Sequence, residues 1–544
     1  MRGSNVNPTL EKQNRFTEIC SVIAVVMIAL IFVVLSVASI MQTCRIDPAN
    51  PASEVINFDN DAIPVNLALI VLSALGIIVL LRRNIRLSKV NTRFILFIMA
   101  IVTAVIPLIW INLVQSTATG TAAVLLNTAR DAAQDQYSSF SGYPGNYSYY
   151  LYYPNELGYV LFAELLYRVF GVDSSDILFQ IPNVIALEFV YIGIVMIAER
   201  IFDRKAVTNL TAIALTVCLQ PMFMTTYTYG MIIGLAFAVW SVYFVIRYMK
   251  EDKLLYAGIA VVLISLSVMF RHSYMIILAA ICIALILHAI RTKRFLALAA
   301  AAVMAVCCVG LPKLITLTYS QRSGQALDTQ VSHVLSAYEG VSDSYMAPGW
   351  YSGTAITTLR DAALTSDGQQ LNRTAVKAAD QTAWDGIDTR LKYLSDSHQL
   401  GDFFKKKLLS QFNEPAFESV WISQVRPHDL PEGEQLPGIV KSVYTGGLSK
   451  LLDHWFEYYN MIVYVGFTAG MIWMIYRRKA SPSAVILPIA VLGNVLYQML
   501  FEGKSQYILP YFILLIPFAM YGLLETSHLL RKKTDFLFRE NSEG

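Results

Sequence analysis

The chain has 544 residues, of which 55% are hydrophobic and only 15% are charged. Its mean hydropathy of +0.50 excludes a soluble globular protein of this size and predicts an all-α integral membrane protein. The net charge of +3 is the small difference between 42 basic and 39 acidic residues, so no overall positive charge is present to attract nucleic acid.

The N-terminal apolar run begins a series of predicted spanning helices. Arg2, Lys12 and Arg15 precede a run at 19–41 that is too long for a signal-peptide core and has no small-residue cleavage site. We interpret it as a retained anchor with a cytoplasmic N-terminus. Because a crossing needs about 20 apolar residues, the chain is predicted to be a polytopic helical bundle of about 12–13 transmembrane segments. The candidates lie near 19–41, 64–82, 94–114, 156–171, 180–199, 206–222, 230–248, 254–270, 274–290, 295–317, 458–476, 482–501 and 507–528.

Basic residues orient the predicted bundle. Short basic loops are expected in the cytoplasm, which leaves the loops at 43–62 and 115–155 outside. The basic clusters lie at 82–93, 291–294, 477–479 and 531–533.

The number of crossings conflicts with a weaker basic cluster at 200–205. Two apolar segments separate it from the outer loop at 115–155, although an odd number is required. Either this cluster breaks the charge rule, or one segment between 156 and 222 fails to cross. We expect a short or broken helix, because 156–171 would span only about 24 Å at 1.5 Å per residue. Pro221 also interrupts a later helix.

Three regions follow from this pattern. Residues 1–317 are predicted to form an N-terminal transmembrane core with an outer loop at 115–155. Hydropathy then falls, and 318–457 is predicted to be an extracytoplasmic, mostly helical domain, since it has alanine, leucine and paired charges but little strand pattern. Residues 458–544 are predicted to form C-terminal transmembrane hairpins and a cytoplasmic tail. The six cysteines predict no disulfide framework or metal spacing.

A tyrosine-rich stretch at 137–171 leads from the outer loop into an apolar segment. Tyrosine combines a flat apolar ring with a hydrogen-bonding hydroxyl, which suits either the membrane interface or a surface on which sugars stack. Both interpretations stay open on this stretch alone. In the second, the predicted acceptor- and sugar-binding residues are Tyr149, Tyr152, Tyr153, Asn155 and, from the last outer loop, Glu502.

Arg271 and His272 interrupt the apolar run SLSVMFRHSYMIILAA, at an outer break between two predicted helices. A guanidinium offers forked donors to a phosphate and keeps its proton. The alternative is an arginine that extends to lipid headgroups. Lys504 and Tyr507, in EGKSQY, lie on the same predicted face. We therefore predict that these four residues bind the phosphate of a lipid-linked donor.

Carboxylates in the first large outer loop are candidates for a general base, which transfer to a hydroxyl acceptor would need near the cations. Asp131 and Asp135, in LNTARDAAQDQY, are four apart and share one face if the segment is helical. They are the predicted catalytic residues, and the alternative is a solvated amphipathic helix on the membrane. Glu164 and Arg168 are also four apart and predict an ion pair along one helix.

These segments together resemble the GT-C superfamily of membrane glycosyltransferases, in particular bacterial relatives of the protein O-mannosyltransferase and aminoarabinose transferase family. The resemblance implies a multi-spanning enzyme that moves a sugar from a polyprenyl-phosphate donor to an extracytoplasmic hydroxyl with inversion. An acid early in the first outer loop would be the base, and basic residues would hold the leaving phosphate. The segments concerned are YYPNELGYVLFAELLYRVFG with its preceding loop, APGWYSG at 347–353, FFKKKLLSQFNEPAFES at 403–419 and FEGKSQYILPY at 501–511.

Two positions depart from the family pattern. The segment STATGTAAVLL at 116–126 has no carboxylate where relatives have one, which shifts the predicted base to Asp131 or Asp135. Gln506 stands where relatives have an arginine, and Lys504 is its predicted substitute.

The sequence thus predicts a hexosyltransferase-type enzyme of the plasma membrane that glycosylates a cell-envelope glycan, lipid or protein. Its partners would be the polyprenyl-phosphate sugar, membrane lipid and the extracytoplasmic acceptor, with no nucleic acid. No cofactor is predicted, and a divalent metal is left open because no ligand spacing is recognisable. Two alternatives need no base: a transporter or flippase of a lipid-linked glycan, and a catalytically inactive GT-C-like protein of cell-wall assembly.

Overall fold

The structure is a computed structural model that describes residues 8–46, 54–82, 87–141, 149–327, 331–363, 373–424 and 435–540. Within these ranges the chain is helical almost throughout, with one pair of short strands. The prediction of an all-α membrane protein is therefore confirmed at this level. Residues 142–148 of the tyrosine-rich stretch and 83–86 of the first basic cluster lie outside the described residues.

Eight helices in the described part of the chain are long and apolar enough to cross a membrane. Their outward side chains are apolar too: Phe97 is 63% exposed and Val306 is 71% exposed, as expected for surfaces that meet lipid. The chain is thus a multi-pass membrane protein. The spans are Arg15–Met41 in α1 (Pro8–Met41), Thr92–Val114 (α3), Ile177–Phe202 (α7), Met231–Glu251 (α10), His272–Thr292 with α12 (Met275–Thr292), Leu296–Ser323 (α13), Gly447–Tyr476 (α20) and Leu509–Arg531 in α22 (Leu509–Glu540).

Shorter and bent apolar helices complete the membrane part. Three helices are apolar but shorter in their described lengths: α2 (Ile63–Arg82), α11 (Leu254–Phe270) and α21 (Ile486–Leu500). One further helix pair is bent by 47°, α8 (Lys205–Thr216) with α9 (Gln220–Phe223) and η5 (Met224–Thr226), and its length and composition fit a broken span or a re-entrant loop. Pro221 lies in the first turn of α9, where its missing N–H costs no helical hydrogen bond.

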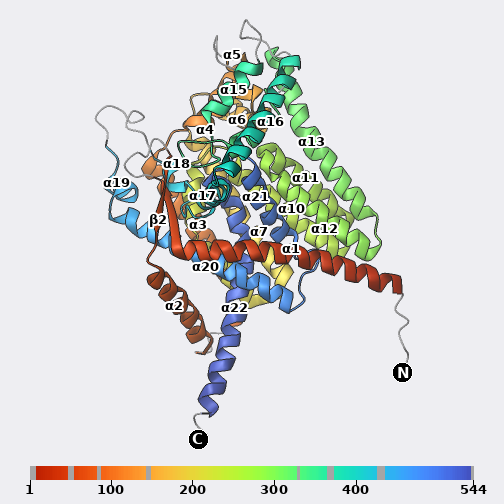
Figure 1. Cartoon of the computed structure of the whole chain (residues 1–544), viewed down its shortest axis with the longest axis vertical. Helices are drawn as coiled ribbons and strands as arrows, with labels where there is room; N and C mark the ends of the chain where they lie inside the picture. Colours follow the sequence, from red (N-terminus) through yellow and green to blue (C-terminus); the bar gives the residue numbers. More distant parts are fainter. Residues whose placement is uncertain are drawn as a thin grey trace.

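The predicted segment at 156–171 becomes α6 (Leu157–Phe170), and its 14 residues extend only about 21 Å at 1.5 Å per residue. It is too short to cross the hydrocarbon core. It packs against α4 (Gly120–Ala133), and Figure 1 shows it, like α15 (Gly353–Ala363), at the end of the molecule opposite the C-terminus. One crossing, α7, then separates the outer loop from 200–205, which removes the conflict in the number of crossings.

The polar segment after α13 is mostly helical where it is described, with an irregular stretch at 342–352. The membrane helices on either side extend into this segment, since α13 ends at Ser323 and α20 begins at Gly447. In Figure 1, α15 and α16 lie at the end of the molecule opposite the C-terminal part of α22. The helices are α14 (Leu335–Val341), α15, α16 (Arg373–Asp396), α17 (Leu400–Phe412), α18 (Ser419–Ile422) and α19 (Gly438–Thr445).

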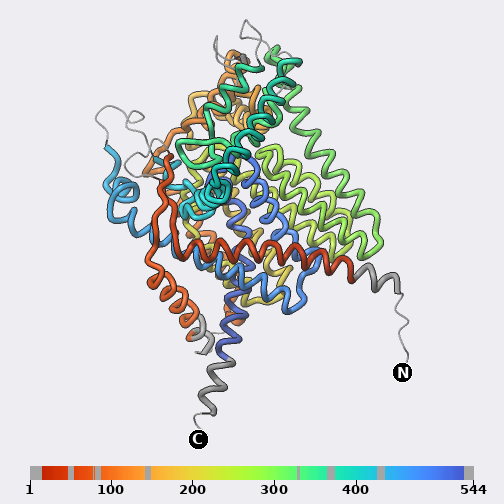
Figure 2. The backbone as a smooth tube through the Cα atoms, in the orientation of Figure 1, coloured from red at the N-terminus to blue at the C-terminus, as the bar shows by residue number. Residues whose placement is uncertain are grey.

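A strand pair that the sequence did not predict connects α1 to α2 (Figure 2). β1 (Gln42–Ile46) and β2 (Ile56–Asn60) are antiparallel, with Cys44 opposite Phe58. The Cys44 N–H donates to Asn413 O at 2.9 Å, and the Ile56 N–H donates to Met346 O at 3.0 Å. These bonds satisfy edge groups of the strands and tie the segment between α1 and α2 to the segments around α15 and α17.

Glycines allow α20 and α22 to pack closely. A Cβ on Gly470 would lie 2.2 Å from Phe518 O, and one on Gly522 would lie 2.2 Å from Gly466 O. Gly466 and Gly470 have the four-residue spacing that lets membrane helices approach through small residues. This contact fixes α22, and therefore the hairpin at 501–507 that precedes it.

Candidate functional site

A cavity of 840 Å³ opens among segments that are far apart in the sequence. Its walls come from the start of α4, η3 (Tyr149–Leu151), the loop before α10, the segment 345–351, α18, α19 and the hairpin at 501–507. Nine tyrosines and one tryptophan give it a surface that is aromatic yet rich in hydroxyl groups. They are Tyr149, Tyr152, Tyr153, Tyr227, Tyr229, Tyr345, Tyr351, Tyr444, Tyr507 and Trp421.

Arg271 lies directly behind two of these tyrosines, in the extended residue between α11 and η6 (His272–Tyr274). Its guanidinium carbon is 4.2 Å from the centroid of the Tyr229 ring and 5.4 Å from that of Tyr507. Its Nη1 donates to Glu156 Oε1 at 2.8 Å, and the Tyr229 hydroxyl donates to the same oxygen at 3.2 Å. The cation is therefore held between cavity-lining rings and neutralised by one carboxylate.

The hairpin at 501–507 supplies an acidic residue, Glu502, and a basic residue, Lys504, to the cavity wall. The Glu502 N–H donates to Ser336 O at 2.7 Å, which fixes the hairpin against the start of α14. Lys504 Nζ donates to the carboxylate of Glu54, which also lines the cavity. Although burial disfavours the ammonium form, the charge and hydrogen bond of Glu54 and the charge of Glu502 raise the pKa of Lys504. Lys504 is therefore a permanent cation at the cavity.

Glu502 is the carboxylate best placed to act on a molecule in the cavity. Burial raises its pKa, while the positive charges of Lys504 and Arg271 oppose this rise. A carboxyl group with a raised pKa in a largely aromatic pocket can exchange a proton at a pH nearer neutral than an exposed glutamate.

The structure brings together most of the predicted binding residues. Six of them line the cavity: Tyr149, Tyr152, Tyr153, Glu502, Lys504 and Tyr507. Arg271 stacks on the wall from behind. His272 is exposed and Asn155 is half-buried, and neither belongs to the wall. Their positions give no support to the predicted binding roles.

The predicted catalytic residues Asp131 and Asp135 also lie outside the cavity wall. Contrary to the expectation from their spacing, they do not share a helix face, because α4 ends at Ala133 and Asp135 follows with a φ of 57°. The Asp135 carboxylate accepts from Arg168 at 2.7 Å, and this hydrogen bond lowers its pKa. A carboxylate with a lowered pKa is a weaker base, so the geometry gives no support to a catalytic role.

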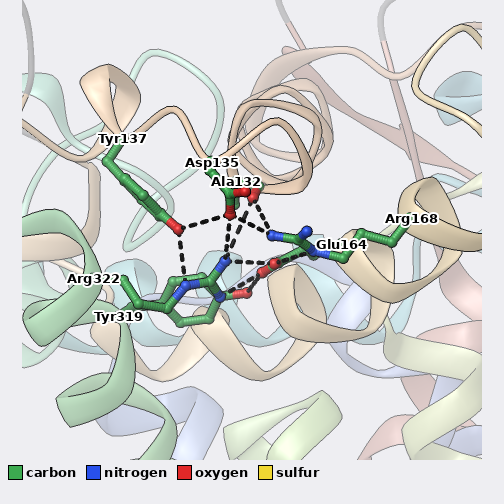
Figure 3. Close-up of polar contacts among 7 residues, drawn as sticks. All are labelled: Ala132, Asp135, Tyr137, Glu164, Arg168, Tyr319 and Arg322. Atoms are coloured by element: carbon green, nitrogen blue, oxygen red, sulfur yellow. Dashed lines mark hydrogen bonds and ion pairs between the residues drawn. The ribbon is translucent and has the colours of Figure 1, made fainter.

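Asp135 instead belongs to a charge network that joins α6, α13 and the end of α4 (Figure 3). The predicted pair is present, with Arg168 donating to Glu164 at 2.9 Å. Arg322 donates to both oxygens of Glu164, at 2.6 and 2.9 Å, and the Tyr319 hydroxyl donates to it as well. Two arginines balance two carboxylates, which indicates a structural clamp rather than a ligand site.

Comparisons with known proteins assign no family. The chain matches no protein-family model and no curated protein. Within the described ranges, no group of three or more His, Cys, Asp or Glu side chains could hold a metal ion. Function must therefore be inferred from the cavity itself.

Sequence reasoning missed several residues of this site, among them Glu54, Glu156, Tyr227 and Tyr229. The two tyrosines follow Pro221 in a helix break, and aromatic residues at such a break are a signal that could have found them. The two glutamates gave no signal, because their partners Lys504 and Arg271 are 450 and 115 residues away in the chain.

Proposed function

We propose that the protein is a membrane glycosyltransferase of the GT-C type, which transfers a sugar from a polyprenyl-phosphate donor to an acceptor hydroxyl outside the cytoplasm. One observation carries this function: Glu502 and Lys504 face the same tyrosine-lined cavity, with Arg271 behind its wall. Aromatic rings with hydroxyl groups suit a sugar, a lysine suits a phosphate, and a carboxylate suits the proton of an acceptor.

In this function Glu502 takes the place of Asp131 and Asp135 as the general base. It accepts the proton of the acceptor hydroxyl while the hydroxyl oxygen forms a bond to the anomeric carbon. The bond between that carbon and the donor phosphate breaks, and the phosphate leaves with the polyprenyl chain. A single displacement of this kind inverts the anomeric configuration.

The two cations contribute differently. Lys504 lines the cavity, so its ammonium group, which also donates to Glu54, would contact the leaving phosphate directly. Arg271 already donates to Glu156, so it would act mainly through the positive potential that it places behind Tyr229 and Tyr507. Both effects stabilise negative charge that develops on the donor phosphate as its bond to the sugar breaks.

The deciding experiment compares Glu502→Gln with Asp135→Asn, two substitutions that each remove one carboxylate and keep its shape. Membranes that contain the protein receive radiolabelled polyprenyl-phosphate glucose, mannose or galactose, and label in envelope material is counted. We expect Glu502→Gln to lower the rate by about 10²–10⁴-fold, the usual contribution of a general base. Asp135→Asn should leave the rate near that of the wild type.

Two results would contradict this function. Unchanged incorporation in a folded Glu502→Gln protein would exclude Glu502 as the base. Wild-type protein that binds the labelled donor without transferring its sugar would favour a transporter or an inactive binding protein, because neither needs a carboxylate in the cavity.

A further inference from the structure

Two segments are joined tightly beside the cavity, 336–340 and 499–502. The Glu502 N–H donates to Ser336 O at 2.7 Å. Lys407 of α17 bridges them, because its Nζ donates to Gly340 O at 2.5 Å and to Phe501 O at 2.8 Å. A Cβ on Gly340 would lie 2.6 Å from Leu500 O, so only glycine fits there. This packing places the buried Glu339 and the cavity-lining Glu502 on adjoining segments.

The surroundings of Glu339 disfavour its ionised form. The residue is 0% exposed. Its Oε1 accepts one long hydrogen bond, 3.5 Å from the Ser352 N–H, and its Oε2 has no partner among the described residues. An ionised carboxylate here would be a buried charge without compensation. Burial and the charge of Glu502 accordingly raise the pKa of Glu339 well above its usual value.

Glu502 differs from Glu339 in the cations around it. Burial and the charge of Glu54 raise the pKa of Glu502 too, but the positive charges of Lys504, Arg271 and Lys407 oppose this rise. Of the two carboxyl groups, Glu502 therefore ionises first. Tyrosines near these carboxyl groups are neutral at pH 7: Tyr153 and Tyr351 lie near both, and Tyr497 and Tyr507 lie near Glu502.

We propose that Glu339 and Glu502 hold a single proton between them and that this proton resides on Glu339. Glu502 is thereby kept as the ionised carboxylate that faces the cavity. Glu339 is a positioning residue, since Glu502 and not Glu339 lies in the cavity wall. Any effect of Glu339 on a reaction rate rests on the proposed transferase function. The position of the proton on Glu339 does not depend on that function.

The place of the proton is tested by infrared spectroscopy of the purified full chain at pH 7, in H₂O and D₂O. The carbonyl stretch of a protonated buried carboxyl group separates from the bands of ionised carboxylates. We expect this band to lose one group's intensity in Glu339→Gln and none in Glu502→Gln. Loss in Glu502→Gln alone would place the proton on Glu502 and overturn the inference. Loss in neither variant would mean that both groups are ionised and would overturn it too.

A second variant tests whether a lost band reflects misfolding rather than the missing carboxyl group. Glu339→Asp keeps a carboxyl group, so it should shift the protonated band rather than remove it. An unshifted band would show that the proton lies elsewhere. Because no substrate enters these measurements, they stand even if the protein transfers no sugar.

The pH profile of transfer supplies the functional test. Since Glu339 is neutral, Glu339→Gln should leave the acid limb of the profile in place. If Glu339 were ionised, Glu339→Gln would instead remove a negative charge and move the acid limb to lower pH. A shift of about one unit, a tenfold change in rate on that limb, would overturn the inference.

Discussion

Three consecutive lysines in α17 show how differently neighbouring residues of one sequence motif can behave. Lys405 and Lys406 are exposed, but Lys407 is 0% exposed. Its Nζ donates to Gly340 O, Met499 O and Phe501 O at 2.5 to 3.1 Å. Burial lowers the pKa of Lys407 to about 7, yet three acceptors match the three protons of an ammonium group. Lys407 thus closes the C-terminal end of α21 and supports the hairpin that carries Glu502.

Lys407→Met should destabilise the protein, because methionine fills the same space and leaves three buried carbonyl groups without a donor. We expect the free energy of unfolding to fall by about 2–5 kcal/mol, measured as a lower melting temperature in detergent. Lys405→Met, an exposed position on the same helix, is the matched control and should have little effect. Equal melting temperatures for the two variants would refute this role of Lys407.

Ser505 indicates a buried proton at a second carboxyl pair. Its Oγ is 2.8 Å from Glu414 Oε2 and 2.9 Å from Glu418 Oε1. One hydroxyl proton cannot serve both contacts, so one carboxyl group must itself be protonated. Glu414 also accepts the N–H groups of Ala416 and Glu418, whereas Glu418 Oε2 is buried without a partner in the described residues. The proton therefore belongs on Glu418.

This pair should make stability depend on pH. Burial raises the pKa of Glu414 to about 7 and that of Glu418 to about 8. The folded state then holds the protons more strongly than the unfolded state, so the stabilisation is complete below the unfolded value of 4.5 and is lost as pH rises through 7 and 8. The melting temperature should fall by on the order of a few degrees over this range. In Glu418→Gln, which stays neutral, the fall should be smaller, and an equally steep curve would contradict the assignment.

At the scale of helices, hydropathy located the apolar helices well. It did not predict the strand pair or which helices pack together, because both depend on packing between distant segments. The apolar run at 156–171 became the non-spanning α6, as its length indicated, and Pro221 marked a true break. The strand pair β1–β2 escaped prediction, because its edges are paired by Asn413 and Met346, hundreds of residues away. The close contact of α20 and α22 was also unseen, since a glycine in an apolar run gives no sign of which helix it faces.

Gly470→Ala should disrupt the contact between α20 and α22. The added methyl group would lie 2.2 Å from Phe518 O, and overpacking of this kind costs about 1–3 kcal/mol. Gly310→Ala in α13 is the control, because a Cβ there has no neighbour within 4 Å. It should leave stability unchanged or raise it by about 1 kcal/mol through helix propensity. Melting temperatures in detergent compare the two, and similar values would show that α22 is free to shift.

Over the whole molecule, the sequence predicted which kinds of residue line the cavity better than it predicted which residues contact one another. Tyrosines and cations outside the cytoplasm suggested a site for a phosphate-linked sugar, and Tyr149, Tyr153, Lys504 and Tyr507 do share one cavity. The choice of acid could not be made from spacing, because Asp135 pairs with Arg168 and Glu339 reaches Glu502 only through the fold. Such pairings depend on contacts between distant segments, which periodicity does not encode.

The orientation of the whole chain rests on its basic loops, and α13 allows a direct test. Its 28 residues extend about 42 Å at 1.5 Å per residue, more than the hydrocarbon core of about 30 Å. α13 is therefore long enough to place its two ends on opposite membrane faces. Thr292 precedes this helix and Ser395 follows it, and both are exposed. None of the six native cysteines is exposed, so they should contribute little background.

A membrane-impermeant maleimide should therefore label Ser395→Cys in intact cells and label Thr292→Cys only after permeabilisation. The reason is the basic cluster at 291–294, which is retained in the cytoplasm. The reverse pattern would place the cavity on the cytoplasmic face, where the proposed transfer outside the cytoplasm could not occur. Labelling of both variants in intact cells would instead show that α13 does not cross, and the count of spanning helices would have to be reduced.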